Sequence, residues 1–278
     1  MKQLTQFLLL LPFLVTAQLS QEFKKHWFDG KAEISSYELT QSRYGEQRSG
    51  KAVLIYVTED FLVKEQVKAN SKSDKSILVL KSNRTKSFLT GIYPYSIMSS
   101  SFNSLSKKHS MLKNSASIQE WCGQSYLQIN QKEEKLNILS HSYFEGEADQ
   151  IIEIDDTFSE DAIWNIIRLN PNNLPTGKFL TLPSLELLRL NHIPIETQVA
   201  EGELTDNSYS YEIKSIGRKL TIFFSSEFPY TVEGWEEKYE GKGEKYHSKA
   251  KRIHTERRAY WQENKALNTV LRKPFKLD

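Results

Sequence analysis

The chain has 278 residues, of which 38% are hydrophobic, and its formal net charge is only +2, which gives it no general electrostatic attraction to nucleic acid. The 14 Phe, 13 Tyr and 5 Trp supply enough apolar area for a core, so a fully disordered chain is excluded. A mean hydropathy of −0.54 and the lack of a long apolar run exclude a polytopic membrane protein, and the single cysteine, Cys122, excludes a disulfide scaffold.

The N-terminal residues have the three-part layout of a secretory signal peptide. Lys2 supplies a positive end, residues 7–15 (FLLLLPFLV) form a short apolar core, and Val15-Thr16-Ala17 offers small residues for cleavage. The apolar core is less than half of the ~20 residues that a membrane anchor needs. We therefore expect a signal peptide at 1–17 and one exported β-rich domain at 18–278, stabilised by packing and strand pairing because no internal disulfide can form.

Short alternating runs with turn signals dominate the rest of the chain and predict an antiparallel sheet. Before residue 150 the strand-like runs are 32–41, 51–59, 77–81, 88–98, 118–122, 125–130 and 138–144. Residues 68–76 and the Ser- and Lys-rich stretch 99–117 carry no apolar period, which predicts loops.

One short helix is predicted at 160–169. Ser159 is a suitable N-cap, acidic residues follow in the first turn, Ile163, Ile166 and Ile167 share one face, and Asn170-Pro171 ends the helix. Further strands are predicted at 178–182, 185–190, 195–199, 209–213 and 219–224, followed by a charged hairpin and helix tail at about 229–278.

Cys122 admits two interpretations. A thiol nucleophile needs a base, and His141, followed by several carboxylates, could serve as one, so a cysteine hydrolase using Cys122 and His141 is an alternative function. The interpretation that we favour is a small buried residue in a strand beside Trp121.

The segment 145–161 holds eight carboxylates and no Lys or Arg. Glu145, Glu147 and Asp149 alternate, so a strand would place them on one face, where carboxylate oxygens could bind Ca²⁺. The spacing is not that of an EF-hand, and charge runs are usually solvated. We therefore expect no metal site, with a solvated strand edge leading into the start of the helix.

The C-terminal region combines basic and aromatic residues. Seven Lys or Arg lie within residues 242–258, with aromatic side chains around them. Such a surface could hold an anionic lipid or glycan, and a solvated hairpin is the simpler alternative. The candidate binding residues are Lys249, Lys251, Arg252, Trp235, Tyr246 and Trp261.

Several motifs together carry a family resemblance: residues 26–61 (HWFDGKAEISSYELTQSRYGEQRSGKAVLIYVTEDF), 90–96 (TGIYPYS), 120–130 (EWCGQSYLQIN), 140–149 (SHSYFEGEAD) and 162–165 (AIWN). With them the chain resembles an uncharacterised family of exported proteins from Bacteroidota, often labelled "septum formation inhibitor Maf". That label implies an intracellular nucleotide pyrophosphatase with a Ser-x-Ser-x-Arg-Arg signature near the N-terminus. The Arg-Arg pair of this chain is Arg257-Arg258, preceded by Thr255-Glu256. The chain is also loosely similar to exported β-rich proteins of the DUF3108 type, which implies an open or half-closed barrel.

The predicted fold is therefore mainly β, a large curved antiparallel sheet or open barrel with one short helix. The function that we favour is an exported cell-envelope protein, periplasmic or extracellular, that is not an enzyme and binds or scaffolds a hydrophobic or anionic envelope component, with the concave face as the expected binding surface. A Maf-like nucleotide pyrophosphatase is a lesser alternative. The expected partners are a lipid, a glycan or an envelope protein, with peripheral membrane contact, no cofactor, no nucleic acid and no transmembrane helix in the mature chain.

Overall fold

The computed structural model describes residues 20–106, 111–241 and 243–277. The predicted signal peptide at 1–17 lies outside the described residues. The helical elements are α1 (Gln21–Trp27), η1 (Glu160–Ala162), α2 (Ile163–Leu169), η2 (Pro171–Asn173), α3 (Leu185–Leu190), η3 (Lys214–Ile216), η4 (Tyr260–Gln262) and η5 (Ala266–Phe275). The strands are β1 (Ala32–Arg43), β2 (Glu46–Leu62), β3 (Val67–Lys68), β4 (Ser76–Thr90), β5 (Tyr93–Ser104), β6 (Met111–Glu120), β7 (Gly123–Lys132), β8 (Lys135–His141), β9 (Gln150–Asp155), β10 (Phe158–Ser159), β11 (Gly177–Leu182), β12 (Gln198–Leu204), β13 (Ser208–Ile213), β14 (Arg218–Phe224), β15 (Val232–Gly241) and β16 (Glu244–Arg258).

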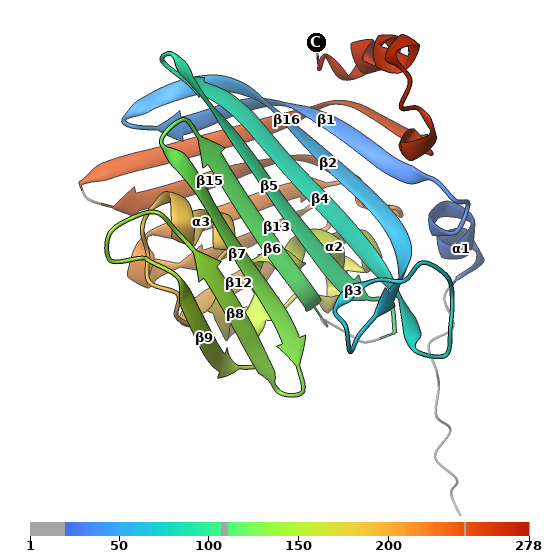
Figure 1. Ribbon diagram of the computed structural model, residues 1–278, viewed down its shortest axis with the longest axis horizontal. Coiled ribbons are helices and arrows are strands. Elements are labelled where there is room, and N and C mark those ends of the chain that lie inside the picture. Colours follow the sequence, from blue (N-terminus) through green and yellow to red (C-terminus); the bar gives the residue numbers. More distant parts are fainter. Residues whose placement is uncertain (1–19, 107–110, 242, 278) are drawn as a thin grey trace, which may run out of the picture.

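The strands of the described residues form one curved, unclosed sheet (Figure 1). Its order is β10-β11-β12-β13-β14-β15-β16-β1-β2-β4-β5-β6-β7-β8-β9, with β3 paired to β2. The pairs along this path are antiparallel except β10–β11, which is parallel. The two edge strands, β9 and β10, are consecutive in the chain, and the three steps from Asp155 to Phe158 span at most ~11 Å. The predicted fold class, a mainly β curved sheet, is confirmed.

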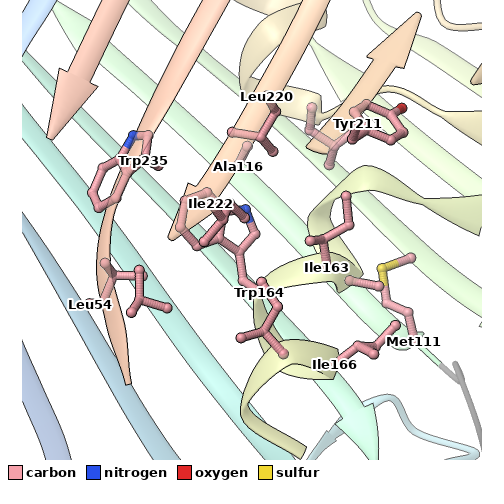
Figure 2. Close-up of a cluster of buried hydrophobic side chains, with 14 of the residues drawn as sticks. Leu54, Met111, Ala116, Ile163, Trp164, Ile166, Tyr211, Leu220, Ile222 and Trp235 are labelled. Carbon is pink, nitrogen blue, oxygen red and sulfur yellow. The ribbon is translucent and has the colours of Figure 1, made fainter. Parts of the chain in front are cut away.

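The helix predicted at 160–169 is confirmed as η1 followed by α2, and it fills the concave side of the sheet. Trp164 of α2 meets Trp235 of β15 edge to face, with the ring centroids 5.2 Å apart. Figure 2 shows this pair within a cluster that also includes Ile163 and Ile166 of α2 and Leu54 of β2. Burial of these large side chains supplies much of the hydrophobic stabilisation, because it grows with the apolar area removed from water. The concave face is therefore the core of the protein, and the expectation that it forms the binding surface is wrong.

The prediction of a loop at 99–117 is wrong, because most of the described residues in this range belong to β5 and β6. Ser99, Ser101 and Asn103 alternate toward the concave side and are buried. Two of them contact α2: the Asn165 side chain donates to the Asn103 side chain at 2.7 Å and to the Ser101 carbonyl at 3.2 Å. Most inner positions between 99 and 117 are thus Ser, Asn or Ala, so no strong apolar alternation marks this stretch in the sequence.

The strand predicted at 185–190 is also wrong, because these residues form helix α3. Leu185 and Leu188 are buried on the helix face that packs into the core, three residues apart, as helical spacing requires. Between them Glu186 reaches Lys86 of β4 at 2.8 Å. The strands predicted at 209–213 and 219–224 are confirmed as β13 and β14, and the strand predicted at 195–199 begins at Gln198.

A buried ion pair ties α2 to the first long strand. Arg168 of α2 donates two hydrogen bonds to the Glu33 carboxylate of β1, and its Nε donates to the Pro229 carbonyl at 2.8 Å. The guanidinium also lies over the ring of Tyr56, 4.7 Å from the centroid. A carboxylate, a carbonyl and an aromatic face thus together compensate for the desolvation of this buried cation.

A second buried network joins η1 and α3 to the strands through four carboxylates and three cations. Asp161 accepts hydrogen bonds from Arg84 of β4, from Asn114 of β6 at 2.6 Å and from the Leu185 amide at 3.0 Å. Its neighbour Glu160 pairs with Arg218 of β14 at 2.5 Å. These contacts connect strands on both sides of the sheet centre through one segment.

The same network continues through Glu237 of β15. The Glu237 carboxylate lies 3.0 Å from Arg218 and 2.7 Å from Lys86, and Lys86 also contacts Glu186 of α3 at 2.8 Å. The indole of Trp235 donates to Glu237 at 3.0 Å. The expectation that Glu160 and Asp161 form a solvated helix start is therefore wrong, since both are buried and paired inside the sheet.

We predict that Arg168→Leu destabilises the protein by about 3–5 kcal/mol, because it leaves the buried Glu33 carboxylate without its cation. The double variant with Glu33→Gln should recover part of that loss, since the unpaired charge is gone. Urea unfolding measures both changes. As a control, Lys245→Ala breaks an exposed pair with Glu240 and should change stability by no more than about 1 kcal/mol. A loss of less than about 1 kcal/mol for Arg168→Leu would contradict the prediction.

We further predict that the stability of the protein decreases as the pH is lowered through the acid range. Burial acts to raise the pKa of Glu33, but Arg168 outweighs it and holds that pKa well below its ordinary value; Lys86 and Arg218 have the same net effect on Glu237. The native state therefore binds fewer protons than the unfolded chain, so this stability is present above the ordinary Glu pKa of about 4.3 and is lost as the pH falls below it. Glu160, whose pKa burial raises, offsets part of this effect. Urea unfolding at a series of pH values should show a shallower acid slope for Glu33→Gln than for the parent, and equal slopes would count against the assignment.

Candidate ligand-binding site

A cavity of about 540 Å³ lies on the outer face of the sheet, opposite the core. Strand alternation explains its floor. In β2, Leu54 and Tyr56 point into the core, so Val53 and Ile55 point outward. Ile55 is directly opposite Ile34 of β1, and Val53 is opposite Thr85 of β4, which makes a largely apolar floor across three strands.

The C-terminal segment after β16 forms the roof of this cavity. η5 and the residues that follow it lie on the outer side of the sheet, beside β16 and β1 (Figure 1). Leu271, Phe275 and Leu277 contribute the apolar lining of the roof. Phe275 is buried and meets His254 of β16 edge to face, with the ring centroids 4.9 Å apart. The roof is thus anchored to the sheet mainly through one aromatic side chain.

The rim of the cavity is polar and basic. Arg258 is held by two carboxylates, Glu256 at 2.7 Å and Glu263 at 2.6 Å, so its charge is largely balanced. Lys265 and Arg272 also line the cavity and are exposed, which leaves the rim with a positive charge. An apolar space of this size with a few charged groups at its edge is suited to an amphiphile: an apolar chain inside and an anionic group at the rim.

The structure does not bring the six predicted binding residues together. Lys249 and Lys251 of β16 are exposed, whereas their neighbour Ala250 points inward. Trp235 is buried in the core, so its assignment to a basic surface is wrong, because strand alternation turns it to the concave side.

The remaining candidates also differ in their surroundings. Arg252 forms a bidentate pair with Glu233 at 2.7–3.0 Å, and Tyr246 stacks on Tyr239 with the ring centroids 5.8 Å apart. Trp261 lies in η4 and is exposed. The predicted hairpin exists as β15–β16, but β16 pairs with β1, so the hairpin is an integral part of the sheet rather than a peripheral tail.

Cys122 is exposed in the turn between β6 and β7, so the expectation of a buried strand residue is wrong. Its backbone amide donates to Glu120 at 2.7 Å. The hydrogen bond and the charge of Glu120 raise the pKa of the thiol, which disfavours the reactive thiolate. His141, the proposed base, instead pairs with Asp149 at 3.0 Å. The described contacts therefore do not assemble a Cys–His pair.

The acidic residues considered for Ca²⁺ are not on a strand. Glu145 lies in a turn, and Glu147 contacts Arg189 of α3 and, at 2.8 Å, His192. Asp149 is held by His141. These partners hold the Glu147 and Asp149 carboxylates on separate basic side chains instead of at a common ligand position. The Arg pair is also engaged: Arg257 contacts Asp29, and Arg258 contacts the two glutamates of the cavity rim.

The floor and roof of the cavity were not identified from the sequence. One signal was present, because residues 52–57 (AVLIYV) are apolar at successive positions rather than at alternate ones. Such a run indicates that both faces of the strand are covered. The cover on the outer side is η5, whose apolar residues are too widely spaced to stand out in a charged tail.

We predict that Cys122 reacts with dithiobis-nitrobenzoate in the folded protein and that Cys122→Ser leaves the thermal unfolding midpoint unchanged, since the thiol is exposed. Glu120→Gln should speed the reaction at neutral pH, because Glu120 raises the thiol pKa. Absorbance of the released thiolate measures the rate. Labelling that requires denaturant would contradict the exposed position of Cys122.

In the part of the chain that the structure describes, no helix is both long and apolar enough to cross a membrane. No family model and no curated protein matches the chain. Among solved structures it is similar to a beta-barrel-like protein of the domain of unknown function DUF1849 from Brucella abortus, with 7% identity and a TM-score of 0.46 over 81% of this chain and 97% of that chain. A porin-like protein from Bacteroides uniformis shares 11% identity with a TM-score of 0.23 over 81% of this chain and 96% of that chain.

Proposed function

We propose that this protein is an exported binding protein of the cell envelope that is not an enzyme and holds an anionic amphiphile in the cavity beneath η5. The observation that carries the proposal is the combination of an apolar floor and roof with the exposed Lys265 and Arg272 at the rim. Export rests on the signal-peptide layout of residues 1–17. The hydrophobic or anionic class of the ligand is the one inferred from the sequence. The proposed site, however, lies on the outer face of the sheet instead of on the concave face or at residues 242–258.

Three physical features favour an amphiphile with a single apolar chain. The volume of about 540 Å³ lies within the range of small-molecule pockets. Ile34, Val53 and Ile55 present aliphatic carbon and no hydrogen-bonding group from their side chains, so an apolar chain would leave no polar partner of these three residues unsatisfied. The positive rim would favour a carboxylate, sulfate or phosphate head group over an ammonium group by simple charge attraction.

The test compares binding of lauric acid and dodecylamine by isothermal titration calorimetry. We predict that the parent protein binds laurate more tightly than the amine. Val53→Trp should weaken laurate binding at least about tenfold, a loss of about 1.4 kcal/mol or more, because the indole fills the floor. Val199→Trp is the matched control, since Val199 is exposed and outside the cavity lining.

Circular dichroism first verifies that both tryptophan variants are folded. Equal laurate binding by Val53→Trp and the parent would refute the assignment of the cavity, as would a preference for dodecylamine. Loss of binding in Val199→Trp alone would place the ligand elsewhere on the sheet.

A further inference from the structure

η5 presents an outward stripe that the cavity does not use. In a 3₁₀ helix, side chains three residues apart lie above one another. Leu267, Val270 and Lys273 follow this spacing in η5, and Lys276 continues it directly after the helix end. All four are exposed, and none lines the cavity. We call these four residues the outer stripe.

The other two rows of η5 explain why the outer stripe has no partner within the chain. Thr269, Arg272 and Phe275 form one row, and Asn268 and Leu271 belong to the other; all of them line the cavity. The segment therefore carries apolar side chains on both sides, with one side covering the cavity and the opposite side facing solvent. Leu267 is 73% exposed and Val270 54% exposed. Large apolar side chains exposed next to each other usually indicate an interaction surface.

Exposed aromatic residues and positive charge lie close to the outer stripe in the sequence. η4, immediately before η5, exposes Tyr260 and Trp261. Between residues 259 and 277 the chain has four basic residues, Lys265, Arg272, Lys273 and Lys276, and one acidic residue, Glu263. Glu263 is itself paired with Arg258, so it does not neutralise the lysines of the outer stripe.

This composition points to an anionic membrane surface as the partner. A short helix with exposed apolar residues, neighbouring Trp and Tyr, and Lys or Arg is the pattern of segments that lie in a membrane interface. The apolar side chains enter the boundary between head groups and acyl chains, and the lysines contact anionic head groups. A glycan would pair with the lysines but would leave Leu267 and Val270 in water.

We propose that the outer stripe, together with Trp261, docks the protein on an anionic membrane. Docking places the roof of the cavity against the bilayer, so that an amphiphile can pass between the bilayer and the cavity without crossing water. This second step rests on the proposed function of the cavity, whereas docking itself does not.

The test is co-sedimentation of the full chain with vesicles of phosphatidylcholine alone and of phosphatidylcholine mixed with phosphatidylglycerol. The parent should bind the mixed vesicles and bind the neutral ones much more weakly. Each lysine near an anionic surface contributes about fivefold to binding, so Lys273→Glu with Lys276→Glu should weaken binding at least about tenfold. Leu267→Ser with Val270→Ser should also weaken it, and what remains should disappear at 0.5 M salt because charge attraction is then screened within roughly 4–5 Å.

Lys249→Glu with Lys251→Glu is the matched control, because it makes the same change in net charge on exposed residues of β16. It should keep most of the vesicle binding of the parent. Absence of parental binding, unchanged binding in both stripe variants, or an equal loss in the β16 variant would overturn the proposal. Laurate titration of the same stripe variants separates the two proposals, because none of the four positions lines the cavity and laurate binding should stay unchanged if the proposed function holds.

Discussion

The interior ion network centred on Glu160 and Asp161 is the constraint on which the architecture depends. A segment with two adjacent carboxylates lies inside a curved sheet, where an unpaired charge would cost several kcal/mol. The strands supply the compensation from distant positions, Arg84 on β4 and Arg218 on β14. These partners lie on opposite sides of the sheet centre, so both charges are satisfied only when the sheet curves around the segment. Curvature and the buried charges thus require each other.

Because the core occupies the concave side, the cavity of about 540 Å³ lies on the other face. Strand β2 is apolar on both of its faces. Leu54 and Tyr56 pack inward, and Val53 and Ile55 form part of the floor of the cavity on the outer side. An uncovered outer row of this kind would expose apolar area to water. η5 covers this row but does not pack against it as closely as the core packs against the inner face. The space left between η5 and the sheet is the cavity.

The sequence predicted the mainly β curved sheet and the helix at 160–169 because these depend on local signals, β-branched runs in one case and a clear apolar period in the other. It did not predict the second half of β5 or most of β6, where the inner positions include Ser101 and Asn103, which contact the distant Asn165. It misassigned 185–190 because six residues rich in leucine fit a buried strand as well as a short helix. The six predicted binding residues share only their composition and closeness in the sequence. Strand alternation places Trp235 on the inner face of the sheet and Lys249 and Lys251 on the outer face.

The helical elements on the two sides of the sheet also differ in the contacts that hold them in place. On the inner side, buried ion pairs join η1, α2 and α3 to strands β1, β4 and β14, so these elements are held by the sheet and open only with it. On the outer side, Phe275 is the buried residue of η5, and the remaining contacts of the roof are at the protein surface. Segments with few buried apolar contacts open at a small fraction of the global free energy of unfolding. The contacts of the roof can therefore open while the sheet keeps its shape, and such opening would widen the entrance of the cavity.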